Sequence, residues 1–285
     1  MQPQMKLTEC PRDAMQGITT FIPTEIKARY INLLLQVGFD TIDFGSFVSP
    51  KAIPQLQDTA EVLKRLDMSS SRSKLLAIIA NYRGAEEASQ HPEITYLGYP
   101  FSISETFQQR NTNTSMTAAF DTVKRINELC GKSGKQLLVY LSMGFGNPYG
   151  DEWSNELVLE WAGKLIGEGT GHIALADTIG IASPRQIKNL YPLLVNSFPE
   201  TGIGIHLHST PTTWREKVAA AYESGCTHFD TALKGYGGCP MAKDELTGNI
   251  ATENVISYLQ SQKIDLGLNM DKLQEAMDFS GRVFS

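Results

Sequence analysis

Two histidines separated by a single residue are the sharpest chemical feature of the sequence. His206 and His208 lie in the segment GIHLHS, whose apolar and β-branched character predicts a buried strand. Residues two apart on a strand point to the same face, so both imidazoles face one side. Two imidazoles on one face suit a divalent cation. A pair of hydrogen-bonded core histidines is the alternative interpretation.

A second candidate group follows the first apolar run, in the segment ECPRD. Asp13 offers an anionic oxygen, and a carboxylate with two neutral imidazoles favours a transition metal or an ion of the Mg²⁺ or Mn²⁺ type. Arg12 can stabilise an oxyanion that develops during a reaction. Taken alone, however, the segment is more typical of a surface turn with a local ion pair.

A glycine-rich segment, KGYGGCPMAKDELTGN, follows the last apolar run and is typical of a mobile lid. Cys239 lies within it and can act as an acid, base or nucleophile if its pKa is lowered. An incidental free thiol is the more common outcome for such a residue. Asn249 ends the segment and offers a neutral amide oxygen, although an isolated asparagine here is more typical of a turn or a helix cap.

Polar residues also accompany two further apolar runs. Asp43 lies within the second run and Asp177 ends the sixth. These carboxylates can orient ligands or contact a substrate, or else serve as a satisfied core group and a helix cap. Ser46, Ser49 and Lys51, in the segment GSFVSPK, can bind anionic substrate groups or simply shape a turn.

Short apolar runs alternate with longer helical patterns along the whole chain. Strands buried on both faces are nearly continuously apolar, as KLLAIIA and QLLVYL are. The expected strands span residues 6–10, 41–47, 74–80, 94–101, 136–143, 172–178, 202–209 and 228–233. The expected helices span residues 25–37, 60–66, 85–91, 117–129, 154–167, 184–195, 214–224 and 252–262.

Eight strand–helix units predict an α/β fold, a closed (β/α)8 TIM barrel. We expect one domain over residues 1–285, with the barrel at about 5–262 and two short appended helices within 263–285. Thr24 is expected to cap the first long helix, and Ser183 followed by Pro184 another. An open doubly wound sheet ranks second, because its usual glycine-rich first turn is replaced by PRDAMQG. In a barrel, catalytic groups gather where the strands end.

Composition limits the class of protein further. The 285 residues are 41% hydrophobic and 20% charged, with a net charge of −6, which argues against a general nucleic-acid binder or a binder of anionic membranes. The four cysteines form no CxxC pair and suit a reducing compartment. With neither a signal sequence nor a membrane span, we expect a cytoplasmic protein.

Taken together, these motifs resemble those of the 3-hydroxy-3-methylglutaryl-CoA lyase family. ECPRDAMQ is similar to the family signature PRDGLQ, and GSFVSPKAIPQLQDTAEVL is similar to its second-strand loop. The segments SETFQQRNTNTS, LADTIGIASP, GIHLHS, GYGGCPMA and TGNIATEN follow in the family's order. The match covers residues 6–255, and GGCP followed by GNIATE is its most specific part.

The resemblance implies a role for each matched residue. It implies a Mg²⁺ or Mn²⁺ ion held by Asp13, His206, His208 and Asn249. It also implies that Arg12 stabilises an enolate and that Cys239 is the catalytic thiol. Further implied catalytic residues are Asp43, where the lyases carry glutamate, and Glu253. The implied substrate contacts are Gln16, Ser46, Ser49, Lys51 and Asp177.

The implied activity is a metal-dependent retro-aldol cleavage of 3-hydroxy-3-methylglutaryl-CoA, or of a related 3-hydroxyacyl-CoA, to acetyl-CoA and a keto acid. Leucine degradation, an acyl-CoA partner and a homodimer are implied with it. The surroundings differ: STPTTW replaces the usual DTYGQA, and GFGNPYGDEW replaces a GCPYEG-like turn. In the first loop AMQGITTF replaces GLQNEK. The alternatives are an acetyl-CoA-dependent synthase acting on a 2-oxo acid and a non-catalytic metal-binding barrel.

Overall fold

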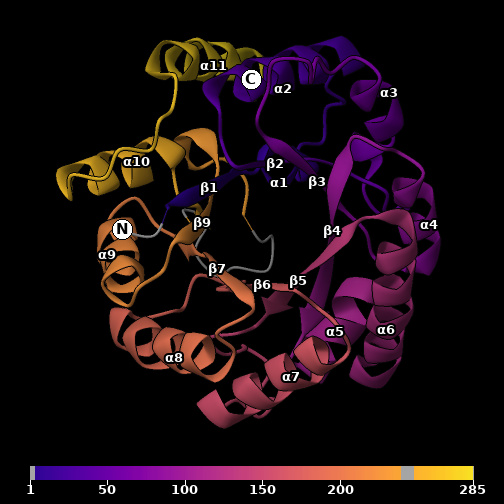
Figure 1. Cartoon of the computed structure of the whole chain (residues 1–285), viewed down its shortest axis with the longest axis vertical. Coiled ribbons are helices and arrows are strands. Elements are labelled where there is room, and N and C mark those ends of the chain that lie inside the picture. Colours follow the sequence, from indigo (N-terminus) through magenta and orange to yellow (C-terminus); the bar gives the residue numbers. More distant parts are fainter. Residues whose placement is uncertain (1–3, 239–246, 285) are drawn as a thin grey trace.

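Eight parallel strands close into a barrel in the computed structural model of the chain, which describes residues 4–238 and 247–284 (Figure 1). Each barrel strand pairs with the next one along the chain, and the last closes on the first. This confirms the expected (β/α)8 architecture. The strands are β1 (Lys6–Glu9), β2 (Thr41–Ser46), β3 (Lys74–Ile78), β4 (Ile94–Ser102), β5 (Gln136–Ser142), β6 (His172–Ala176), β7 (Gly202–His206) and β9 (His228–Thr231).

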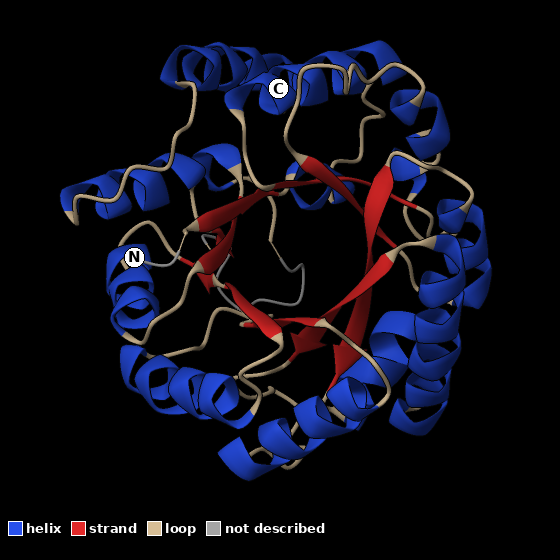
Figure 2. Cartoon of the chain, in the orientation of Figure 1, coloured by secondary structure: helices blue, strands red, loops and turns tan. Residues whose placement is uncertain are grey.

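Helices surround the strands on the outside, as Figure 2 shows. The ring consists of α2 (Thr24–Val37), α3 (Thr59–Leu63), α4 (Tyr82–Ser89), α6 (Met116–Ser133), α7 (Asn155–Gly167), α8 (Pro184–Ser197), α9 (Trp214–Glu223) and α10 (Thr252–Ser261). Shorter helices lie in the connections: α1 (Pro11–Gln16), η1 (Pro54–Leu56), α5 (Glu105–Thr112) and η2 (Leu233–Gly235). The last helix, α11 (Met270–Val283), packs beside α2 (Figure 1).

Buried side chains pack against one another inside the barrel. Leu76, Ile78, Leu138, Tyr140 and Ala174 come from three strands and form one buried cluster inside it. Within a strand these residues are two apart, which is the spacing that turns both toward the axis. The interior is therefore a packed core, and functional groups must lie where the strands end.

A small two-stranded sheet lies at that mouth. β8 (His208–Ser209) pairs antiparallel with β10 (Gly248–Asn249), and the pairing sets Asn249 opposite His208. The expected strand 202–209 is thus wrong in one respect, since it is split into β7 and β8. The break lets His206 stay in the barrel while His208 pairs with Asn249, at the end of the glycine-rich segment.

Several expectations about local structure need correction. The segment around Arg12, interpreted as a turn, is the short helix α1, which has Pro11 at its first position. Thr24 does not cap α2: Pro23 is the N-cap, and the Thr24 hydroxyl donates to Asp58 at 2.7 Å. The two expected tail helices are the single helix α11. The Ser183 cap is confirmed, as a capping box with Gln186.

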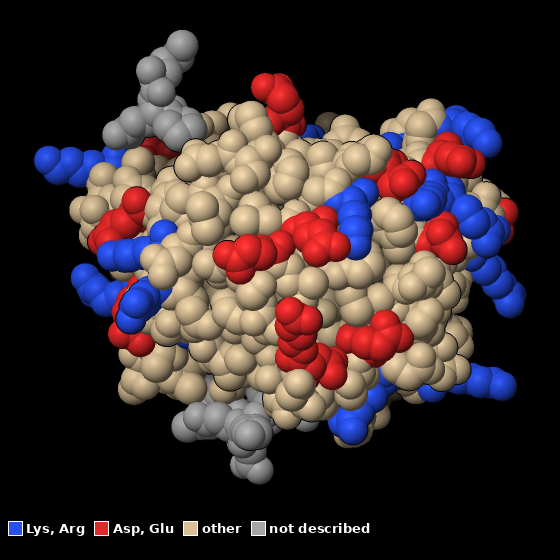
Figure 3. All heavy atoms as spheres, turned by 90° about the horizontal axis from the view of Figure 1, so that it is seen from below, with Lys and Arg blue, Asp and Glu red and all other residues tan. Residues whose placement is uncertain are grey.

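The described surface carries charges of both signs. On the face shown in Figure 3, acidic side chains occupy the middle and basic ones lie mostly toward the edges. None of the described helices is both long and apolar enough to span a membrane. The three cysteines within the described ranges, Cys10, Cys130 and Cys226, are buried and free.

Candidate metal and catalytic site

Three potential ligands converge at the mouth of the barrel. Asp13 comes from α1, His206 from the end of β7 and His208 from β8, and all three are buried. One ligand atom of each lies within 4.8 Å of the others. β1 and β7 flank β9 in the barrel, so α1, which follows β1, brings Asp13 over the end of β9 toward the histidines.

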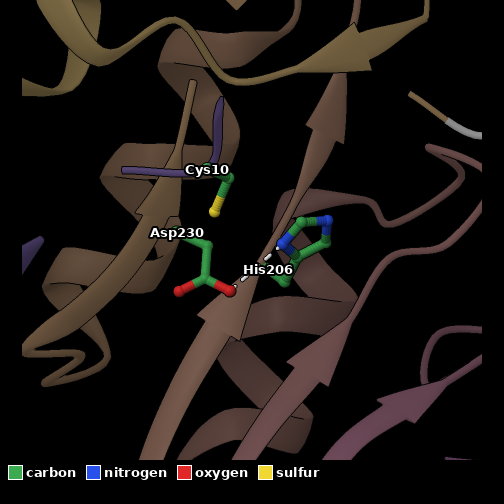
Figure 4. Close-up of side chains that lie close together, drawn as sticks. All are labelled: Cys10, His206 and Asp230. Atoms are coloured by element: carbon green, nitrogen blue, oxygen red, sulfur yellow. Dashed lines mark hydrogen bonds and ion pairs between the residues drawn. The ribbon is translucent and has the colours of Figure 1, made fainter. Parts of the chain in front are cut away.

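The hydrogen bonds of the two imidazoles define which nitrogen faces the site. His206 Nδ1 lies 3.2 Å from Asp230 Oδ2 (Figure 4), and His208 Nδ1 lies 3.0 Å from the Thr178 carbonyl. A carboxylate and a carbonyl only accept, so each Nδ1 carries the hydrogen and each Nε2 is left with its lone pair. The two Nε2 atoms are only 3.3 Å apart. Such an approach requires a shared proton or a cation between them, and with Asp13 this donor set fits a divalent metal ion.

Burial and charge shift the pKa values of this group in ways that fit its contacts. Burial opposes the charged form of Asp13, but Arg12, His206 and His208 outweigh it and lower the pKa. Burial also opposes protonation of His206, yet the hydrogen bond to Asp230 raises its pKa. His208 behaves in the opposite way, because burial and the neighbouring His206 lower its pKa.

Asn249 adjoins the ligand set without pointing its oxygen at it. Its Nδ2 donates to Asp13 Oδ2 at 2.6 Å and to the Tyr236 carbonyl at 3.0 Å. The amide nitrogen therefore faces Asp13, where the sequence predicts the oxygen as a ligand. The two ends of an amide differ little in shape, so a half-turn of χ2 would bring the oxygen to this side.

Arg12 is held by three side chains beside the ligands. Its Nε donates to Asp43 Oδ2 at 3.0 Å and its Nη2 to the same oxygen at 2.5 Å. Its Nη1 donates to Asp13 Oδ1 and to Gln16 Oε1, each at 3.0 Å. Burial works against the guanidinium charge, but Asp43 and Asp13 outweigh it and raise the pKa of Arg12. Burial raises the pKa of Asp43 to about 6, and Arg12 limits that rise.

Arg12, Asp13, Gln16, His206 and His208 form the polar end of a cavity of about 760 Å³. Its other wall is largely apolar and includes Ile18, Val48, Ile53 and Phe107. Tyr140 also lines the cavity, and its buried hydroxyl has no hydrogen-bond partner among the described residues. A pocket with one apolar wall and one charged end suits a small molecule with an acyl or alkyl part and oxygen ligands.

Other predicted site residues lie outside this cavity's lining. The Ser46 hydroxyl is buried and bonds the Ile78 carbonyl and the Val48 amide, so it shapes the turn. Ser49 and Lys51 are exposed.

Asp177 and Glu253 are also held by neighbours. Asp177 is buried and forms an ion pair with Lys217 at 2.8 Å. Glu253 accepts from the Lys234 amide at 3.1 Å, where the glycine-rich segment begins. Cys239 lies outside the described residues.

Sequence reasoning missed Tyr140, Asp230 and Lys217. Tyr140 and Asp230 lie inside the expected strands 136–143 and 228–233, and neither was singled out. The available signal was a polar side chain two residues from an inward-facing neighbour, as Asp230 is from His228. Cys10, next to Asp230 and His206 in Figure 4, was noticed only as a cysteine. Burial and Asp230 raise the pKa of Cys10, so its thiol stays neutral.

Comparison with known proteins shows the family of the chain. The HMGL-like family model matches residues 6–279. The chain is 33% identical to a mitochondrial hydroxymethylglutaryl-CoA lyase of Mus musculus over 279 residues, which cover 97% of this chain and 84% of the relative. It is 34% identical to a hydroxymethylglutaryl-CoA lyase of Bacillus subtilis over 266 residues, which cover 93% and 88%.

The solved structures that resemble this chain include HMG-CoA lyases. The HMG-CoA lyase of Bacillus subtilis superposes with a TM-score of 0.90 at 33% identity, covering 97% of this chain and 92% of that one. An HMG-CoA lyase of Acinetobacter baumannii, solved with coenzyme A and 3-methylmalate, gives 0.90 at 31% identity and covers 99% and 91%. The carboxyl transferase domain of Rhizobium etli pyruvate carboxylase, 16% identical with a TM-score of 0.73, shares the fold alone. The chain therefore belongs to the HMGL-like family of enzymes.

Proposed function

We propose that this enzyme is a divalent-metal-dependent carbon–carbon lyase that cleaves 3-hydroxy-3-methylglutaryl-CoA, or a related 3-hydroxyacyl-CoA, to acetyl-CoA and a keto acid. One observation carries the proposal: Asp13, His206 and His208 converge beside Arg12 at the polar end of a cavity with an apolar wall. A retro-aldol reaction needs this combination, a group that activates a hydroxyl and a cation that stabilises an enolate.

Asp13, His206, His208 and Asn249 would hold a Mg²⁺ or Mn²⁺ ion, with Asn249 turning its amide oxygen toward it. The bound ion would supply Lewis acidity, which lowers the pKa of the substrate's hydroxyl and orients it. Asp13 is already fixed in place, since Arg12, Gln16 and Asn249 donate to it at 3.0, 2.7 and 2.6 Å. Such support lets a carboxylate keep one geometry through a catalytic cycle.

Arg12 is assigned the role of stabilising the enolate. The substrate's hydroxyl gives its proton to a base, for which Asp13 is the candidate, and its oxygen becomes the ketone of the keto acid. When the carbon–carbon bond breaks, the electron pair of that bond passes to the thioester carbonyl, and the negative charge develops on that oxygen. Asp43 holds the guanidinium through Nε and Nη2, so the side chain has little freedom to reorient. A fixed, buried cation stabilises a developing charge more strongly than a mobile one in water.

Cys239 is assigned the role of donating the proton that converts the enolate into the methyl group of acetyl-CoA. This role rests on the family resemblance. Glu253 supports the same loop from its base, through its contact with the Lys234 amide. Asp43 is assigned as the partner of Arg12, and Gln16 as a substrate contact at the cavity wall.

The substrate class is an acyl-CoA thioester. The relative from Acinetobacter baumannii was solved with coenzyme A, and the apolar wall of this cavity suits an acyl chain. A homodimer in the cytoplasm, with a role in leucine degradation, remains the expectation for the assembly and its setting.

Product analysis tests the proposal directly. The purified protein, given Mn²⁺ and 3-hydroxy-3-methylglutaryl-CoA, should release equal amounts of acetyl-CoA and acetoacetate, as detected by mass spectrometry. The control adds acetyl-CoA with glyoxylate, pyruvate or 2-oxoisovalerate. Release of free coenzyme A in that control, without cleavage of the first substrate, would identify a synthase instead.

A further inference from the structure

Lys217 on α9 is a buried lysine whose ammonium group makes three hydrogen bonds. Its side chain is 4% exposed, and Nζ donates to Asp177 Oδ2 at 2.8 Å, to the Gly180 carbonyl at 2.9 Å and to the His208 carbonyl at 2.7 Å. All three hydrogens of an ammonium are thus used. A buried ion pair alone contributes little to the stability of a fold. The three hydrogen bonds of Lys217 therefore indicate a further role, which depends on the acceptors that they reach.

The three acceptors all control the position of one imidazole. The His208 carbonyl belongs to the proposed ligand itself. Asp177 and Gly180 delimit the turn that contains Thr178, and the Thr178 carbonyl lies 3.0 Å from His208 Nδ1. Lys217 therefore fixes the main chain of His208 and, separately, the turn that fixes its ring.

Asp177 ties the same turn to the other histidine. Its main-chain N–H donates to the His206 carbonyl at 2.8 Å, and its Oδ1 accepts from the Ala182 amide at 3.0 Å. With Oδ2 on Lys217, both carboxylate oxygens have partners within the protein. Asp177 does not line the cavity, although the sequence predicts a substrate contact for it.

We propose that Lys217 is a positioning residue of the metal centre, which holds His208 so that its Nε2 faces Asp13 and His206. The inference rests on the proposed metal-dependent function. Asp177 acts as the counterion of Lys217 and not as a substrate contact. Groups that orient metal ligands in this way commonly change metal affinity about 10- to 100-fold when they are removed.

The test must separate positioning from the stability of the ion pair. K217M removes the three donors but leaves Asp177 as an uncompensated buried carboxylate, which destabilises the fold. The double variant D177N/K217M removes both charges, so much of that stability should return. It does not restore the donors to the His208 and Gly180 carbonyls.

A second pair, between a buried lysine and a half-buried aspartate, provides the matched control. Lys27 on α2 bonds Asp58 at 2.7 Å and also the Gln55 carbonyl, and its side chain is 2% exposed. Neither member of this pair contacts a proposed metal ligand. K27M/D58N should therefore alter the urea unfolding curve while it leaves metal affinity unchanged.

The experiment is a calorimetric titration of each purified protein with MnCl₂, beside its urea unfolding curve. We expect D177N/K217M to unfold at a urea concentration above that of K217M and to bind Mn²⁺ about 10- to 100-fold more weakly than the wild type. Wild-type Mn²⁺ affinity in the folded double variant, or an equal loss in K27M/D58N, would overturn the role of Lys217 alone. Failure of the wild type to bind Mn²⁺ would overturn the metal centre as well.

Discussion

Tyr140 allows the role of a single hydroxyl to be tested, because this buried hydroxyl has no hydrogen-bond partner among the described residues. Y140F should leave the free energy of unfolding unchanged or slightly higher, since no hydrogen bond is lost in the free enzyme. If the hydroxyl bonds the substrate in the cavity, kcat/KM should fall about 10-fold, which corresponds to one hydrogen bond.

Tyr191 provides the control for this hydroxyl. Its buried hydroxyl donates to the Ile203 carbonyl at 2.7 Å, away from the cavity. Y191F should cost about 1 kcal/mol of stability and leave kcat/KM intact. Unchanged kcat/KM in Y140F would remove this tyrosine from the reaction.

Cys239 is the residue to which the proposed mechanism assigns the final proton. Replacing it by serine, in C239S, should lower kcat by about 10²- to 10⁴-fold, the usual contribution of a general acid. Mn²⁺ affinity should stay the same, because Cys239 is not among the proposed ligands. C130A, which alters a buried cysteine on α6, should keep full turnover. Equal kcat in C239S and C130A would exclude the thiol from catalysis.

At the level of elements, Glu9 joins β1 to α10 and η2 through a buried carboxyl group. It accepts from the Thr252 hydroxyl at 2.5 Å and from the Leu233 amide at 2.8 Å. Burial raises its pKa to about 8 from an ordinary value of 4.5, although these two hydrogen bonds act against the rise. The folded state therefore holds a proton that the unfolded chain has released.

The sign of the pH dependence follows from this shift. Glu9 contributes most to stability below about pH 4.5, and that contribution is lost as the pH rises toward 8. E9Q keeps one acceptor for Leu233 and does not titrate. The free energy of unfolding in urea should be compared between E9Q and the wild type from pH 4.5 to 8. The difference should shift in favour of E9Q by up to about 1.4 kcal/mol per pH unit. A difference that stays flat across this range would contradict a raised pKa.

Most barrel elements can be predicted because a parallel strand buried on both faces must be continuously apolar. The strand that begins at Lys74 is such a case, and its expected and observed starts agree. The connecting helices α1 and α5 escaped prediction, because α1 has only six residues and α5 has a single large apolar side chain, Phe107, so neither shows a periodic apolar face. Thr24 was assigned as a cap from its residue type alone, whereas Pro23 has the backbone angles of the N-cap.

The site was partly predictable for a related reason. His206 and His208 share a face by spacing, and Asp13 joins them because the barrel gathers the ends of its strands. The orientation of the Asn249 amide and the pairing of Asp177 with Lys217, 40 residues apart, depend on contacts that no local pattern encodes. The resemblance therefore suggested a substrate contact for Asp177, whereas the structure pairs its carboxylate with Lys217.

At the level of the whole molecule, the ligands join α1, near the start of the chain, to β7 and β8, which lie far from it in sequence. A cation bound there stabilises only the closed barrel. Mn²⁺ at 100 times its dissociation constant should add about 2.7 kcal/mol to the free energy of unfolding. Thermal or urea unfolding with and without MnCl₂ measures this gain, and H208A should lose most of it. An equal gain in H208A would mean that the ion binds elsewhere.

The most direct test of the central claim is the cleavage of 3-hydroxy-3-methylglutaryl-CoA by protein that has been stripped with EDTA and then titrated with Mn²⁺. Acetyl-CoA release should be absent after stripping, return as the site fills in the wild type, and stay absent in H206A. Full cleavage in excess chelator, or equal recovery in H206A, would contradict a reaction that depends on a metal ion held by these residues.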